Sequence, residues 1–174
     1  TLIAIKSYVW KGESKRYDGK TQEALTIFEN FLKSYPDNSL APLVESLIGL
    51  IYFDQNKLDL SEEYLINGTA SDDPITRAKS FTMIGEIQLR KKNYIKARGN
   101  FEPALRITES EDNVHLRAML GMGVSLFHLG EYENAISYFR DAENLNPAFE
   151  PDKISFYMAE CYFNLGKFQE ALTR

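Results

Sequence analysis

Apolar residues recur along much of this chain at steps of three and four positions, the period of one face of an α-helix. Between residues 132 and 145 they form a single stripe, with polar residues on the opposite face. The segment 118–129 is instead apolar nearly all round, so a helix there needs cover on every side. Gly130 separates these two segments and Pro147 closes the second. Strand signals are weak, and the pattern predicts an all-α protein built from paired helices.

The helix pairs are copies of one unit, because small residues recur in register. Each of five small residues precedes a second one by twelve positions: Gly12, Gly49, Gly85, Gly123 and Ala159 precede Ala24, Ser61, Ala97, Ala135 and Ala171. The second members follow one another at intervals of 37, 36, 38 and 36 residues. Constant inner spacing with variable length predicts rigid pairs joined by variable loops. We expect repeats at about 5–40, 41–76, 77–112, 115–150 and 151–174, forming one domain over 1–174.

The small residues have a packing reason. Gly123 on the first helix and Ala135 on the second would let the two helix axes approach closely. Glycine inside a helix costs up to about 1 kcal/mol relative to alanine, so its recurrence indicates a compensating close contact. A large side chain at either position is expected to cost roughly 1–3 kcal/mol through overpacking.

The repeat resembles the tetratricopeptide repeat (TPR). The fourth copy carries that family's pattern most fully, in Met122-Gly123, Gly130, Tyr132, Ala135, Phe139, Ala142 and Pro147. Three positions depart from it: Ser61 and Gly68 stand where the family prefers alanine, and Phe31 replaces a small residue. The resemblance implies a right-handed α-solenoid of about five helix-turn-helix units, the last one truncated, with first helices lining a concave surface.

A finer resemblance concerns one helix. The run from Ala24 to Pro36 is similar to repeats of bacterial envelope TPR proteins, the Tol-Pal-associated and outer-membrane assembly lipoprotein types. Similar helices occur in other bacterial TPR proteins. The compartment therefore stays open between the periplasm or cell envelope and the cytoplasm.

The family resemblance also implies which residues face the groove. The groove is the concave surface formed by the first helices. Residues expected to line its C-terminal half are aromatic and aliphatic with few charges, so we expect an apolar protein-binding surface. The expected residues are Leu50, Phe53, Met83, Glu86, Arg90, Leu120, Val124, Phe127, His128, Phe156, Tyr157, Glu160 and Phe163. Alternatives are cover by the same chain or by a second copy, and loose packing without function. A chaperone-tail clamp is not expected, because its first positions hold Val9 and Glu13 instead of lysine and asparagine.

The amino-acid composition limits the kinds of binding and catalytic site that the chain can contain. The 174 residues are 44% hydrophobic and 26% charged, as in a globular protein, and the net charge of -5 gives no bulk attraction to nucleic acid. The single Cys161 excludes an internal disulfide and a cysteine zinc site, and we expect it to be buried and inert. His115 and His128 would lie roughly 20 Å apart on one helix, too far to share a metal. We expect no metal, no cofactor and no catalytic residue.

Two clusters of charged residues are expected to be solvent-exposed and to have no binding role. The basic residues between Arg90 and Arg98 are interpreted as a solvated face, and Glu109, Glu111 and Asp112 as a solvated loop. No charge-free stretch is long enough to span a bilayer, so this segment is not expected to insert into a membrane. Thr1 and the incomplete last repeat indicate a piece of a longer chain.

The predicted function is a non-catalytic scaffold that binds a peptide or helix of a partner protein in the apolar groove. The alternatives are a self-assembling structural module, which would be a homo-oligomer, and a regulatory arm of a larger enzyme or envelope complex. Nucleic acid is not an expected partner.

Overall fold

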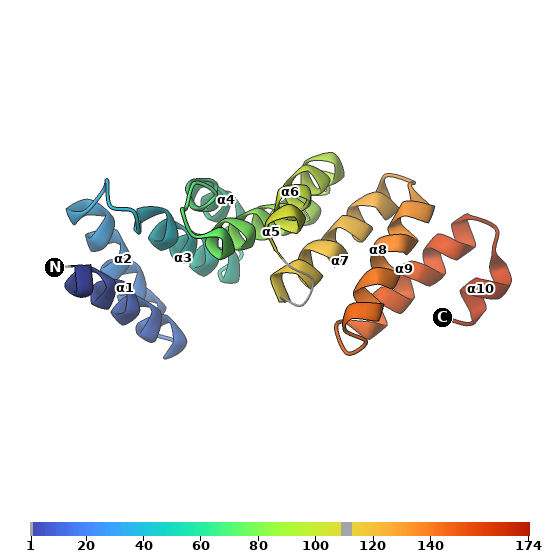
Figure 1. Ribbon diagram of the computed structural model, residues 1–174, viewed down its shortest axis with the longest axis horizontal. Coiled ribbons are helices and arrows are strands. Elements are labelled where there is room, and N and C mark those ends of the chain that lie inside the picture. The colour runs from blue at the N-terminus through green and yellow to red at the C-terminus, as the bar shows by residue number, and fades with distance from the viewer. Residues whose placement is uncertain (1, 109–112) are drawn as a thin grey trace. The chain divides into compact units, whose positions relative to one another are not determined.

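The computed structural model describes residues 2–108 and 113–174, and within them it contains ten helices and no strand (Figure 1). The predicted acidic loop of Glu109, Glu111 and Asp112 lies outside the described residues. The helices are α1 (Leu2–Tyr17), α2 (Thr21–Ser34), α3 (Ala41–Asp54), α4 (Leu58–Gly68), α5 (Pro74–Arg90), α6 (Tyr94–Ile107), α7 (Asn113–His128), α8 (Tyr132–Leu145), α9 (Pro151–Asn164) and α10 (Phe168–Leu172).

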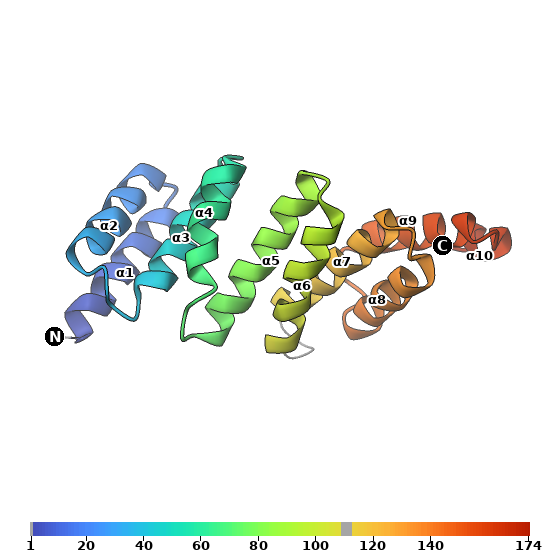
Figure 2. The same ribbon diagram turned by 90° about the horizontal axis from the view of Figure 1, so that it is seen from above.

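The chain folds as two compact units, Thr1–Met83 and Ile84–Arg174, with the boundary inside α5. In the first unit α1 packs on α2, α2 on α3, and α3 on α4. In the second, α6 to α10 pack in chain order, each helix beside the next (Figure 2). The predicted all-α fold of about five helix-turn-helix repeats, the last ending in a five-residue helix, is confirmed.

One residue in every repeat adopts the left-handed backbone conformation, at the turn between its two helices. These are Gly19, Asn56, Lys92, Gly130 and Gly166, with φ of 73, 57, 59, 80 and 72°. Glycine adopts such angles without steric cost, whereas residues with a Cβ adopt them at a cost. The turn at Gly130 was predicted from its glycine. At the same place in the repeat, Asn56 gives a weaker signal, because asparagine also tolerates this region, and Lys92 gives none.

The recurring glycines make room for a large side chain sixteen positions later. A Cβ atom on Gly123 would lie 2.5 Å from Cε1 of Phe139, and one on Gly85 would lie 2.6 Å from Cε1 of Phe101. Both rings are fully buried. The close approach predicted from the sequence is therefore present, but the group that fills it is the ring rather than the small partner residue alone.

The second repeat shows how its departures from the family pattern are accommodated. Ser61 is buried, and its hydroxyl donates a hydrogen bond to the carbonyl oxygen of Gly49 at 2.7 Å. Gly68 leaves no room for a Cβ beside Ser46 and Ser80, whose hydroxyls share a hydrogen bond of 3.0 Å. Small polar groups thus replace the apolar contact, and each has a partner.

Phe31, the departure in the first repeat, belongs to the core of the first unit. It is fully buried, with the rings of Tyr8 and Tyr35 at centroid distances of 6.4 and 5.5 Å. The position therefore accepts a large side chain because neighbouring aromatic residues pack around it.

Helix α7 is buried almost all round, as its composition predicted. Every residue from Ala118 to Leu126 is buried, and α6, α8 and α9 pack against the helix. No helix within residues 2–108 and 113–174 combines the length and the hydropathy of a membrane span.

Cys161 provides a simple test of the packing of α9. Its side chain is fully buried, and desolvation raises the pKa of the thiol to about 12. Only the thiolate reacts with alkylating reagents, so the folded protein should resist iodoacetamide at pH 8. We expect rapid labelling after unfolding in urea, as measured by intact mass. Equal labelling rates with and without urea would show that α9 does not hold this thiol in the core.

Candidate functional site

The first helices of the third, fourth and fifth repeats border a cavity of about 1040 Å³ in the second unit. The end of α5, the following turn, the length of α7, the loop before α9 and the start of α9 all contribute. The lining residues are Glu86, Leu89, Arg90, Lys92, Tyr94, Asn113, Arg117, Leu120, Gly121, Val124, His128, Ala148, Phe149, Glu150, Lys153 and Tyr157.

The cavity has an apolar floor, which α7 supplies. Leu120 and Val124 are one turn apart and are buried, and Gly121 lies beside them. A Cβ atom on Gly121 would lie 2.5 Å from Cε1 of Phe101, so this helix sits directly on the ring from α6. The floor is therefore part of the packed core and is held rigidly.

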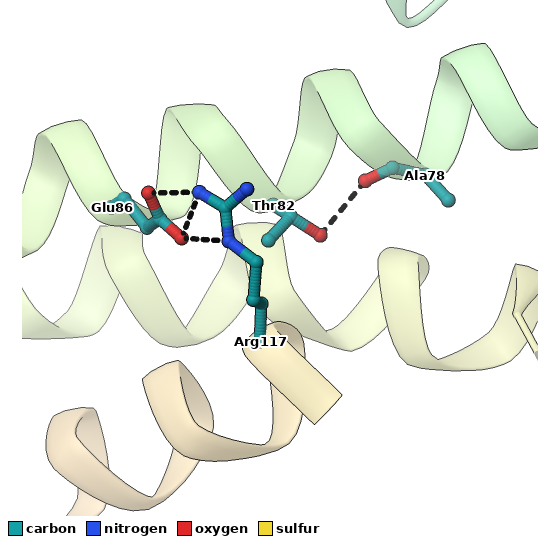
Figure 3. Close-up of polar contacts among 4 residues, drawn as sticks. All are labelled: Ala78, Thr82, Glu86 and Arg117. Atoms are coloured by element: carbon teal, nitrogen blue, oxygen red, sulfur yellow. Dashed lines mark hydrogen bonds and ion pairs between the residues drawn. The ribbon is translucent and has the colours of Figure 1, made fainter. Parts of the chain in front are cut away.

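An ion pair joins the two helices on one side of the cavity (Figure 3). Arg117 on α7 donates from Nε and Nη2 to Oε1 of Glu86 on α5, at 3.0 and 2.7 Å, and from Nη2 to Oε2 at 2.7 Å. The side chains are 42 and 23% exposed, so water screens the pair and it contributes at most about 1 kcal/mol. Its geometric effect is to fix both charged groups at the cavity.

Aromatic rings form another part of the wall. His128 stacks on Tyr94 with ring centroids 4.3 Å apart and an interplanar angle of 15°, and Tyr157 meets His128 edge-on at 6.4 Å. Desolvation and then the charge of Lys92 lower the pKa of His128, which is therefore neutral at pH 7. Desolvation and then Tyr94 raise the pKa of Tyr157, whose hydroxyl keeps its proton. The wall is a neutral aromatic surface with hydroxyl donors.

The structure separates the predicted groove residues into three sets. The cavity is lined by Glu86, Arg90, Leu120, Val124, His128 and Tyr157. The same unit contains four that are not among the lining residues, Phe127, Phe156, Glu160 and Phe163. The first unit contains Leu50, Phe53 and Met83. Of the first set, Leu120 and Val124 are the buried ones.

The cavity carries more charge than the expected groove. Arg117, Lys153 and Glu150 were not among the groove residues predicted from the sequence, and Lys92 was assigned to a solvated face. Loops and the N-terminal parts of α7 and α9 supply these side chains, whereas the prediction considered the central positions of the first helices. One signal was available: Arg117 and Lys153 are 36 positions apart and so occupy the same place in adjacent repeats.

The basic cluster near the turn of the third repeat is divided by the fold. Arg90 and Lys92 line the cavity. Arg98 faces the next repeat, where Nη1 donates to Oε1 of Glu131 at 2.8 Å. Lys96 is exposed on α6. A solvated face therefore describes only part of this cluster.

Sequence comparison matches two parts of the chain to known families. Residues 6–38 match the family model "Tetratricopeptide repeat", and residues 90–174 match "Anaphase-promoting complex, cyclosome, subunit 3". Superkiller protein 3 of Schizosaccharomyces pombe is 28% identical over 107 residues, covering 59% of this chain and 7% of that protein. The anaphase-promoting complex subunit CDC16 of Saccharomyces cerevisiae is 24% identical over 170 residues, 94% of this chain and 19% of that protein. The chain thus spans less than a fifth of either relative.

Solved structures share the fold. MamA superposes with a TM-score of 0.80 at 18% identity, covering 99% of this chain and 88% of that one. YrrB, described as a TPR protein with an unusual peptide-binding site, superposes with a TM-score of 0.77 at 14% identity, covering 95 and 80%. Together with the five helix pairs, these likenesses show that the chain has the fold of a tetratricopeptide-repeat solenoid, and residues 6–38 match the model of that repeat.

Proposed function

We propose that this chain is a non-catalytic interaction module that binds a peptide or helical segment of another protein in the cavity formed by α5, α7 and α9. The observation that carries the proposal is the cavity itself: it has the volume of a ligand site, a rigid apolar floor and a polar rim. Ligand sites commonly combine apolar burial for affinity with a few polar groups for orientation.

The comparisons support this proposal at the level of the fold. YrrB is described as having a peptide-binding site, and CDC16 as a subunit of the anaphase-promoting complex. Each description names a contact with other polypeptides, a bound peptide for YrrB and membership of a complex for CDC16. The finer resemblance to bacterial envelope proteins rests on the segment from Ala24 to Pro36 and stays a prediction.

A position-specific crosslinking experiment tests the proposal. A photoreactive amino acid replaces His128, which lines the cavity, or Gly99, which is exposed on α6 with open space around it. Both variants are irradiated with a displayed library of random peptides. We expect peptides to be captured and enriched from position 128 and only background capture from position 99. Equal yields from both positions would mean that the cavity is not a peptide-binding site.

Self-assembly is the second candidate, because large apolar side chains are exposed on the last two helices. Phe156, Phe163, Phe168 and Leu172 are 58, 61, 58 and 82% exposed. Patches of this kind commonly mark contact surfaces. Sedimentation over a wide concentration range distinguishes the two functions: self-assembly predicts a rising mass that Phe163→Ser suppresses, and a constant monomer mass rejects it.

A further inference from the structure

The charges around the cavity are opposite in sign to the charge of the whole chain. Arg90, Lys92, Arg117 and Lys153 line it, against only Glu86 and Glu150, whereas the chain contains 20 basic and 25 acidic residues. Electrostatic interactions at a surface act over roughly 8–10 Å at physiological salt, so a ligand in the cavity is affected mainly by these local groups. Local charge therefore favours a ligand that carries carboxylates.

Two of the cations are available to a ligand. Arg117 is held by Glu86. Lys153 forms no ion pair among residues 2–108 and 113–174. Lys92 likewise has no ion-pair partner in that part of the chain, and its charge instead faces the neutral ring of His128. A ligand carboxylate near these lysines would gain opposite charge without displacing an existing ion pair.

The backbone at Lys92 strengthens this argument. Lys92 has a φ of 59°, at a turn where three of the other repeats have glycine and one has asparagine. A lysine in the left-handed region is under steric strain that glycine avoids. Strained residues cluster at functional sites. Two of them line this cavity, Lys92 and Glu150, whose φ is 46°, and Lys92 places a cation at its edge.

The apolar floor and the aromatic wall indicate that the ligand also carries an apolar group. Leu120 and Val124 offer apolar contact. Tyr94 and Tyr157 add aromatic surface, although one face of each ring is stacked against a neighbouring ring. A segment that places an apolar side chain next to one or two carboxylates would satisfy both features. A long polyanion such as nucleic acid fits less well, because the net charge of -5 on the chain would repel its remaining phosphates.

We propose that the cavity binds a short acidic segment of another protein, with its carboxylates at Lys92 and Lys153 and an adjacent apolar side chain on the floor formed by Leu120 and Val124. This inference rests on the proposed function and specifies the chemistry of the partner. The chaperone-tail clamp is not assembled around this cavity, because its lysine and asparagine positions hold Thr82 and Glu86 in the third repeat.

The test uses the whole chain and peptides selected from the same random library. Affinity is measured by fluorescence anisotropy for each selected peptide and for its version with glutamine and asparagine in place of the acids. The lysine variants are Lys92→Gly, which removes the cation and relieves the backbone, Lys153→Gln, and both together. Lys96→Gln is the matched control, since Lys96 is exposed on α6 and does not line the cavity.

We expect the selected peptides to be rich in acidic residues next to apolar ones. Each lysine variant should raise Kd about threefold and the double variant about tenfold, while Lys96→Gln leaves Kd unchanged. Neutralising the peptide should have the same effect as the double variant, and affinity should fall as salt rises. Thermal unfolding should show that Lys92→Gly is at least as stable as the unmodified chain, which excludes misfolding as the cause.

Three outcomes would overturn the inference in distinguishable ways. Peptides captured at position 128 that lack acids and ignore the lysine variants would refute the acidic ligand and leave the proposed function intact. No peptide captured at position 128 would refute both. Binding of a single-stranded oligothymidine probe that weakens in the double lysine variant, with no peptide binding, would make the occupant a nucleic acid.

Discussion

Replacing Phe101 by alanine is expected to lower the free energy of unfolding of the second unit by about 3–5 kcal/mol. Its ring is fully buried and lies between Gly85 on α5 and Gly121 on α7, so both glycines lose their packing partner when it is removed. Neither glycine has a side chain that could fill the space. The change should therefore leave a cavity between adjacent repeats.

Urea denaturation followed by circular dichroism measures this loss. Phe163→Ala is the matched control, because that ring is 61% exposed and its removal should cost far less. Hydrogen exchange adds a local readout: protection should fall in α5, α6 and α7. An unfolding midpoint for Phe101→Ala no lower than that for Phe163→Ala would show that the ring does not hold these helices together.

A second large effect is expected at Gly123, and its sign should depend on Phe139. In the unmodified chain, Gly123→Ala places a Cβ atom 2.5 to 2.8 Å from three atoms of the fully buried Phe139 ring. We expect destabilisation by about 1–3 kcal/mol through overpacking. In a Phe139→Ala background the ring is gone and alanine is the better helix former, so the same change should stabilise by up to about 1 kcal/mol.

A double-mutant cycle measured by urea denaturation gives this coupling directly. Gly99→Ala serves as the control, because Gly99 is exposed within α6 and a Cβ atom there meets nothing within 4 Å. It should stabilise the chain slightly in either background. If Gly123→Ala destabilises equally with and without the Phe139 ring, the glycine is required for another reason.

The repeat pattern alone predicted a large part of this structure. Constant spacing between Gly123 and Ala135, and its equivalents, predicted five helix pairs, and the apolar composition of 118–129 predicted a helix covered on all sides. These predictions succeeded because helical periodicity and turn glycines are local properties that the sequence carries directly. The single-domain boundaries and the groove residues remain predictions.

Other features depended on tertiary contacts. The sequence identified the small residues, but only the packed structure showed that each recurring glycine lies under a large side chain sixteen positions away, a phenylalanine ring in three repeats and Leu65 in the second. Side-chain direction depends on how the two helices cross, so the sequence pattern does not give these contacts. The charged rim has the same origin: Lys92, Arg117 and Lys153 come from different repeats and converge only when α5, α7 and α9 border one cavity. The sequence by itself therefore determined the repeat and its helices. Tertiary packing decided which side chains share a surface, because that surface joins residues from separate repeats.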